Sequence, residues 1–165
     1  MPDIPNRTLA EFLRGNIDLE NDTLRIALFD DSTAFTFDPD THEFVGDVLD
    51  GGTTAQELQG SAGYTGTSDR QTLTTVSVTA DDTDDEGVFD ADDVTWTAVE
   101  STADIQGWIV YVQVGGDDTT PADDPLIQVE DDDLTNAAAN LPLTTDGSDV
   151  KIEWPGEGII NGLTP

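Results

Sequence analysis

The sequence predicts a mainly β protein: an antiparallel β-sandwich or jelly roll with a short N-terminal helix. Three observations lead to this prediction. Apolar and polar residues alternate with a period of two in several short runs, which is typical of strands with one solvent-exposed face. Polar, acidic turn sequences separate these runs, and a helical pattern occurs near the amino terminus. At 165 residues, a single domain over 1–165 is expected.

The helix is expected over about residues 8–14. Thr8 and Glu11 have the spacing of a capping box, in which two side chains bond to backbone N–H groups at the start of a helix. An apolar stripe follows, formed by Leu9, Phe12 and Leu13. Gly15 stands where a left-handed residue ends many helices. The pattern therefore predicts about two helical turns.

Four runs alternate as half-exposed strands do: Leu24–Phe29, Val76–Ala80, Val94–Ala98 and Val150–Trp154. Trp108–Val112 is apolar on both faces, which predicts a central strand. A shorter strand is expected over Leu126–Val129, and Pro125 restricts it to a sheet edge or a strand start because proline lacks the N–H of a ladder.

The stretches between these strands are predicted with less detail. Asp146–Gly147 is a hairpin-turn pair that separates Leu143 from Val150. The segment Phe29–Gln71 contains no clear strand pattern and is expected to form a long excursion. Leu134–Leu143, with three consecutive alanines, is interpreted as either a helical turn or a loop.

The charge of the chain is strongly one-sided. There are 36 Asp and Glu (27 of them Asp) against 5 Lys and Arg, with Lys151 the single lysine, so the net charge is −31. Such an excess repels itself, but at molar salt the Debye length falls to roughly 3 Å and screens the repulsion. The composition therefore indicates an extreme halophile or its virus and a high-salt environment. It excludes general nucleic-acid binding, and no apolar run predicts membrane insertion.

One acidic segment has the spacing of a calcium loop. Counted from Asp82, carboxylates stand at positions 1, 3, 5 and 12, with glycine at position 6: Asp82, Asp84, Glu86 and Asp93, with Gly87. These residues are the candidate ligands of a Ca²⁺, Mg²⁺ or Na⁺ ion. Position 12 is the shorter Asp, and the flanks have strand patterns, so a solvated hairpin loop is the alternative. No cofactor is expected to be required.

Histidine and tryptophan are two further residue types that could form a site. His42, in Asp38–Glu43, is interpreted as a locally packed or solvated loop histidine rather than a base or cation ligand, because no nucleophile motif accompanies it. No catalytic residue is predicted, and the protein is expected not to be an enzyme. Trp96, Trp108 and Trp154 lie on the inward side of predicted strands, which favours core packing over a sugar-binding platform.

The order of elements and several short sequence segments support a resemblance to a known protein family. They are Gly15–Leu19, Asp22–Phe29, Phe37–Phe44, Gly63–Thr65, Leu73–Val78, Phe89–Trp96, Gly107–Tyr111, Val150–Trp154 and Gly158–Ile160. This layout, over about Leu9 to Leu163, resembles a family of small structural proteins from the virion modules of tailed phages and haloarchaeal tailed viruses. The resemblance implies a non-enzymatic β-sandwich virion component that assembles symmetrically.

The function expected from this resemblance is that of a capsid decoration or turret subunit on the exterior of a halophilic virus particle. The alternatives are a tail structural protein, or a host-recognition module that binds glycans or cations. The expected partners are further copies in a closed ring, which would cover exposed sheet edges, and the major capsid protein or another virion protein. The expected docking surfaces are Leu9–Leu13 with Arg7 and Arg14, and the tail Gly158–Pro165. The acidic loops Asp81–Glu86 and Asp117–Asp133 are expected to face the brine.

Overall fold

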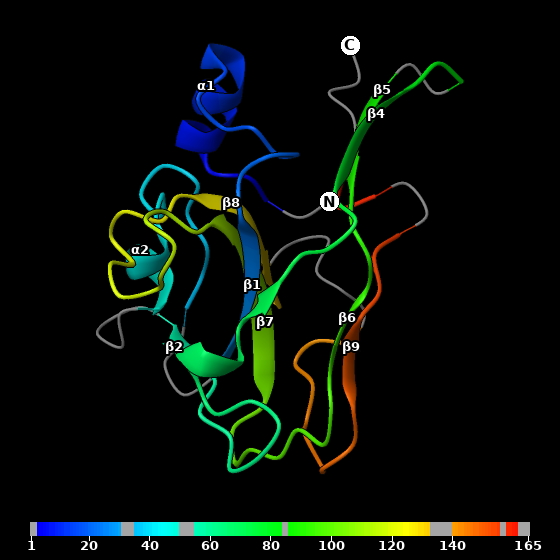
Figure 1. Cartoon of the computed structure of the whole chain (residues 1–165). Coiled ribbons are helices and arrows are strands. Elements are labelled where there is room, and N and C mark those ends of the chain that lie inside the picture. Colours follow the sequence, from blue (N-terminus) through cyan, green and yellow to red (C-terminus); the bar gives the residue numbers. More distant parts are fainter. Residues whose placement is uncertain are drawn as a thin grey trace.

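A computed structural model describes residues 3–30, 35–49, 55–83, 86–132, 140–155 and 158–161. It confirms a mainly β protein with antiparallel sheets and a short N-terminal helix (Figure 1). Within these residues, no helix has the length and apolar character needed to cross a bilayer.

The largest sheet forms the centre of the molecule. Its strands are β1 (Leu24–Asp30), β2 (Gln56–Glu57), β3 (Gln71–Thr72), β7 (Ile105–Val112) and β8 (Leu126–Asp131). They follow the order β2-β1-β7-β8, and β3 pairs with β1 beside β2. The predicted central strand is confirmed because β7 lies between β1 and β8. The predicted strand after Pro125 is confirmed at an outer position, as β8.

Two smaller sheets pack against one face of the large sheet (Figure 1). One contains β4 (Ser77–Asp81), β5 (Glu86–Asp90) and β10 (Ile160–Asn161), and the other pairs β6 (Val94–Trp96) with β9 (Val150–Ile152). The buried cluster between these layers includes Ile26, Leu28, Val110, Phe89, Trp96 and Val150. β6 and β9 alternate between buried and exposed residues, as predicted. The packing is that of a sandwich.

The other face of the large sheet is also covered, which the sequence did not predict. The expected excursion folds over it and contains α2 (Val45–Leu49). Its Val45 and Val48 pack in a second buried cluster with Ala27 and Phe29 of β1. The prediction that β1 has a solvent-exposed face was wrong, because its alternate residues Ala27 and Phe29 are themselves apolar and have a covering layer.

The N-terminal helix α1 spans Asn6–Arg14 and ends at Gly15, whose φ of 71° is left-handed as predicted. The capping-box prediction was wrong. The helix begins two residues earlier, after Pro5, and no side chain caps it. Thr8 therefore lies within the first turn, fully buried, and its hydroxyl donates to the carbonyl oxygen of Leu126 in β8. That bond attaches the helix to the outer strand of the large sheet.

The hairpin predicted at Asp146–Gly147 is confirmed as a turn but not as a hairpin. Asp146–Gly147 does form a turn, with Gly147 at a φ of 85° and the Ser148 N–H donating to Asp146 Oδ1. Its flanks do not pair with each other, because Leu143 bridges to Ile105 and Val150 pairs with Trp96. Of the predicted helical turn or loop at Leu134–Leu143, residues 134–139 lie outside the described part.

Candidate functional site

The candidate cation ligands are only partly brought together. Asp82 is exposed at the tip of the β4–β5 hairpin, directly after Asp81, which pairs with Glu86, the first residue of β5. Asp84 lies outside the described residues. Asp93 lies past the other end of β5, a strand that alone spans roughly 13 Å at about 3.3 Å per residue. The hairpin position of Asp82 and Glu86 agrees with the solvated-hairpin alternative.

Asp93 has partners of its own. Its Oδ2 is 2.9 Å from Nζ of Lys151, and its Oδ1 accepts the backbone N–H of Trp154 at 3.2 Å. The bond from Lys151 holds the pKa of Asp93 below its ordinary value. Among the described residues, no group of three or more potential metal-ligating side chains forms. Cation binding at the hairpin tip stays a prediction for Asp82, Asp84 and Glu86.

His42 is engaged in local packing. Its Nδ1 accepts the backbone N–H of Asp38 at 2.9 Å. Its ring centroid lies 5.0 Å from that of Phe35 and 5.8 Å from that of Phe37. These contacts match the interpretation of a packed loop histidine.

The three tryptophans differ in burial. Trp96 is 2% exposed, and its indole N–H donates to the carbonyl of Asp69 at 2.7 Å, so its predicted core position is confirmed. Trp108 and Trp154 are only partly buried against the same core. The indole N–H of Trp108 is inaccessible to solvent and has no hydrogen-bond acceptor within the described part of the chain.

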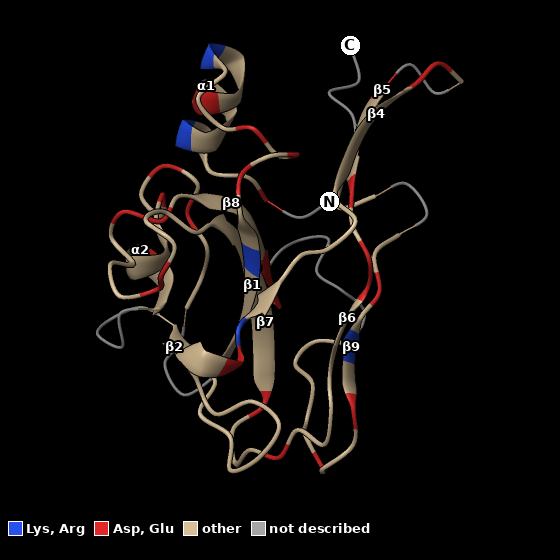
Figure 2. Ribbon diagram, in the orientation of Figure 1, with Lys and Arg blue, Asp and Glu red and all other residues tan. Residues whose placement is uncertain are grey.

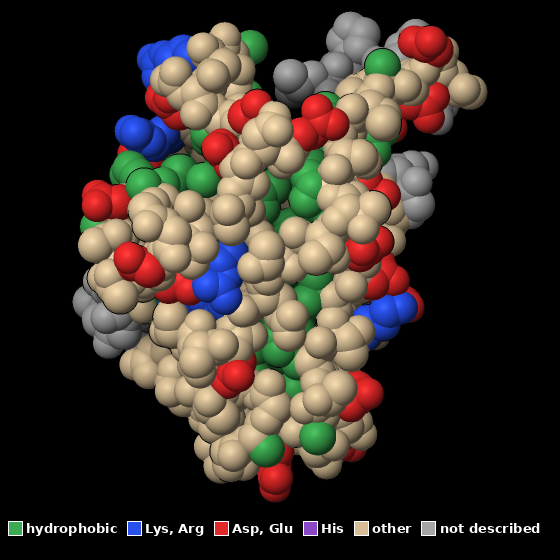
Figure 3. Space-filling model, in the orientation of Figure 1, with side chains coloured by type: hydrophobic (Ala, Val, Ile, Leu, Met, Phe, Trp, Pro, Cys, Tyr) green, Lys and Arg blue, Asp and Glu red, His purple; other side chains and the backbone are tan. Residues whose placement is uncertain are grey.

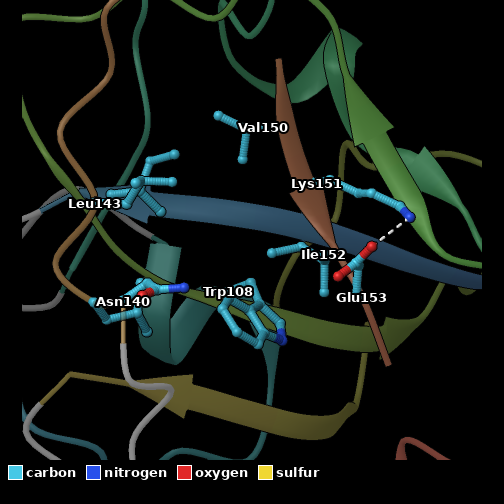
Figure 4. A pocket seen from close by; sticks show the side chains of 9 residues that line it. Trp108, Asn140, Leu143, Val150, Lys151, Ile152 and Glu153 are labelled. Atoms are coloured by element: carbon cyan, nitrogen blue, oxygen red, sulfur yellow. Dashed lines mark hydrogen bonds and ion pairs between the residues drawn. The ribbon is translucent and has the colours of Figure 1, made fainter. Parts of the chain in front are cut away.

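Trp108 lines a cleft between the large sheet and the β6–β9 sheet, which we call the Trp108 cleft (Figure 4). Its volume is about 490 Å³, and its apolar walls are Ile105, Trp108, Leu141, Leu143, Val150 and Ile152. Polar groups stand beside them: Asn140 points toward the Trp108 ring, and Lys151 forms an ion pair with Glu153 at 2.7 Å. Because this lysine also pairs with Asp93, the cleft has no excess of positive charge to attract an anion.

A second depression lies between α1 and strand β4, and we call it the α1 groove. Its volume is about 420 Å³, and it is lined by Phe12, Gly15, Ile17, Asp18, Leu19, Glu20 and Val78. Apolar side chains are visible between α1 and the β4–β5 hairpin in Figure 3. Val78 is 46% exposed, and Leu13, on the helix beside the groove, is 86% exposed. The predicted docking helix is thus open to solvent on one side.

The charges around α1 are unusual for this chain. α1 carries Arg7 and Arg14, two of the five cations of the chain, and it is marked blue in Figure 2, while red positions are spread over most other elements. The side chains of Arg7 and Arg14 are 41% and 64% exposed. Arg14 contacts Glu11 at 2.6 Å, and Arg7 lies 3.9 Å from Glu43. By contrast, Arg25 and Arg70 have side chains only 16% and 4% exposed.

The structure bears on two of the expected surfaces. In the tail, Ile159 is 3% exposed and Ile160 pairs with Phe89 in β10, so both residues are engaged within the fold, and docking by the tail stays a prediction. Residues 162–165 lie outside the described part. The stretch Asp117–Asp133 is an exposed loop only in its first half, because β8 follows and both Asp124 and Asp131 are fully buried.

Sequence reasoning missed a buried ionic cluster, the Glu57–Arg70 network, which also contains Tyr64, Tyr111 and Asp118. Arg70 donates through Nε and Nη2 to the two carboxylate oxygens of Glu57, at 2.8 and 2.9 Å. Its Nη1 donates to the Tyr111 hydroxyl at 3.2 Å, and that hydroxyl donates to Asp118 at 2.6 Å. Glu57 and Arg70 are 8% and 7% exposed, so the network fastens the excursion to the sheet away from water.

The network shifts the acidity of its members. Burial raises the pKa of Tyr64 well above its ordinary value, and the nearby Glu57 carboxylate raises it further. Burial likewise raises the pKa of Tyr111. For Arg70, burial lowers the pKa, but the bonds from Glu57 outweigh this and raise it overall. One feature of the sequence pointed to such a network: the chain has only five cations, so each arginine is expected to pair with one of the many carboxylates.

Comparison with protein-family models, curated proteins and solved structures finds no match to this chain.

Proposed function

We propose that this protein is a non-enzymatic structural subunit on the exterior of a halophilic tailed-virus particle, acting as a capsid decoration or turret subunit. The observation that carries the proposal is the division of the surface. The exposed arginines Arg7 and Arg14 and the exposed Leu13 gather on α1, while acidic side chains dominate elsewhere. This division is expected of a subunit that binds the particle through one face and exposes its remaining, acidic surface to concentrated salt.

Physical reasons support the acidic side facing solvent. An array of like-charged subunits keeps particles apart and hydrated, and molar salt screens the repulsion within the array. The loop Val114–Asp123 is largely exposed and lies on a different part of the molecule from α1, so it is suited to the outer side. The order of elements noted in the sequence, which resembles that of virion structural proteins, also supports the proposal.

The test is the composition of purified particles. Virus particles purified in molar salt should contain many copies of the chain by quantitative mass spectrometry. Antibodies against Val114–Asp123 should label intact heads by electron microscopy. Labelling confined to tails would transfer the protein to the tail alternative, and its absence from purified particles would contradict the proposal.

A second candidate function is recognition of a neutral glycan by the Trp108 cleft. The specific observation is an aromatic wall next to amide and carboxylate groups in a cleft large enough for a sugar ring. Neutral oligosaccharides should then change the tryptophan fluorescence of the wild type. Asn140→Ala should weaken the effect, whereas Asp117→Asn, in the exposed loop, should not. Unchanged fluorescence at millimolar sugar would contradict this function.

A further inference from the structure

We propose that two copies of this chain pair face to face through the α1 groove, with Leu13 of each copy seated in the groove of the other. The pairing deepens the proposed function, since it names a second copy as the partner of the α1 surface. It is tested on the isolated chain, so its failure is distinguishable from absence of the chain in virus particles. It concerns the one described surface where a prominent apolar side chain stands directly beside an apolar depression.

The projecting part of this surface is the end of α1. Leu13 is 86% exposed, although leucine gains free energy when it is removed from water. Its neighbour Phe12 lines the groove, about 100° away around the helix. Gly15 then ends the helix, and a Cβ built at that glycine would meet no atom within 4 Å, so the chain there is open to an approaching partner.

The receiving part is the α1 groove itself. Its apolar surface comes from Phe12, Ile17, Leu19 and Val78, and Val78 is 46% exposed. Asp18 and Glu20 also line the groove and add negative charge to it. Glu20 is held there because its Oε1 accepts the backbone N–H of Val78 at 3.3 Å. The groove is therefore suited to a ligand that is apolar in the middle and positively charged at the side.

The end of α1 has that chemistry. Leu13 is followed by Arg14, whose side chain is 64% exposed. If Leu13 of one copy enters the groove of the next, Arg14 comes near Asp18 and Glu20 of that copy. Because projection and groove belong to one patch, a two-fold axis allows both copies to make the same contact, as isologous interfaces do. This charge complementarity favours a second copy over an acidic foreign protein, whose carboxylates would meet Asp18 and Glu20.

Salt should strengthen the pairing. Two chains of net charge −31 repel at long range, and raising the salt from 0.1 M to 1 M shortens the Debye length from about 10 to about 3 Å. The apolar contact survives this screening. An interface made mainly of exposed ion pairs would instead weaken with salt.

The first test measures mass by light scattering in 3 M KCl. Wild type should have about twice the 17.6 kDa of the chain. Leu13→Glu should raise the dissociation constant by roughly tenfold or more, because a buried leucine is replaced by a charge. Val114→Glu is the matched control, since Val114 is exposed (43%) but lies in another region, and it should leave the mass unchanged. A monomeric wild type, or a Leu13→Glu dimer of unchanged affinity, would overturn the proposal.

The second test identifies the contact. The chain has no cysteine, so introduced thiols have no native competitor. A mixture of Leu13→Cys and Val78→Cys chains should form a disulfide-linked dimer under mild oxidation, whereas Leu13→Cys with Val114→Cys should not. Equal cross-linking in both mixtures, or none in either, would show that Leu13 does not occupy the groove of a second copy.

Discussion

The carboxylate at the centre of the Glu57–Arg70 network is buried and ion-paired, whereas Asp82 in the β4–β5 hairpin is exposed to solvent. In the network, Glu57 receives two bonds from Arg70 and one from Tyr64, and all three side chains are buried. In the hairpin, the β4 residues are mostly exposed and Asp82 is open to solvent at the tip. The difference indicates that the buried Glu57 carboxylate depends on a protein cation, whereas the exposed hairpin acids are solvated by water and screened by dissolved ions.

The largest expected effect separates these two regions by salt. On transfer from 3 M to 0.1 M KCl, the longer Debye length restores repulsion among the surface acids. The β signal in circular dichroism should therefore be lost, or the melting temperature should fall steeply. Hydrogen exchange during the transfer should show the β4–β5 hairpin opening before β1 and β7. A melting temperature that does not change with salt would contradict this view.

Next in size is the loss of the buried cation. Arg70→Met should reduce the free energy of unfolding by about 3–5 kcal/mol, because it leaves the Glu57 carboxylate buried without its partner. Since the network is shielded from solvent, this loss should be similar in 1 M and 3 M KCl. Arg14→Met is the control and should cost less than about 1 kcal/mol, as exposed ion pairs contribute little. Equal effects of the two substitutions would remove the distinction between the regions.

High pH tests the tyrosines of the network. The chain has only two tyrosines, Tyr64 and Tyr111, and both are buried with raised pKa values. Above pH 10 the unfolded chain loses these protons while the folded chain keeps them, so stability falls by about 1.4 kcal/mol per pH unit for each tyrosine. Phenolate absorbance should appear only together with loss of the β signal. Phenolate formation near pH 10 in a folded protein would contradict the prediction.

The smallest effect concerns a buried acid outside the network. Asp124 is fully buried, its Oδ1 accepts the Val114 N–H at 2.8 Å, and burial raises its pKa. Its ionised form therefore destabilises the fold at neutral pH, and the penalty disappears as the pH falls through the raised pKa. Asp124→Asn should stabilise by up to about 1 kcal/mol at pH 7 and less at pH 4. Asp117→Asn should not, because bonds from Thr119 lower the pKa of Asp117.

The sequence predicted those parts of the fold that depend on local pattern. The alternation of apolar and polar residues, together with short apolar runs, predicted the mainly β class and the strands β1, β4, β6, β7, β8 and β9. The tendency of glycine to adopt a left-handed conformation predicted the end of the helix at Gly15. It missed β2, β3 and β10, which are two residues long and exist only because neighbouring strands pair with them. It also missed β5, whose alternation is hidden among acids.

The candidate sites could not be predicted in full because they depend on contacts between residues that are distant in sequence. Glu57, Arg70 and Asp118 are far apart in sequence, and only the fold of the excursion brings them together. In the same way, the spacing of Asp82 to Asp93 resembles a loop, but an intervening strand separates the last carboxylate from the first. The helix that carries Arg7 and Arg14 was predicted from its apolar stripe and Gly15, and it was expected to be a docking surface because this segment is poor in acids.

The outer edge of β8 limits how copies of this protein can join. Its backbone is already used by other segments of the same chain: Val129 exchanges two hydrogen bonds with Asp3, the Leu126 N–H donates to Glu43, and the Leu126 carbonyl accepts from Thr8. A neighbouring subunit that tried to extend the sheet by adding a strand would have to displace these bonds first. The large sheet is thus closed to edge-to-edge growth along β8, and any particle built from this subunit has to hold together at that side through side-chain surfaces.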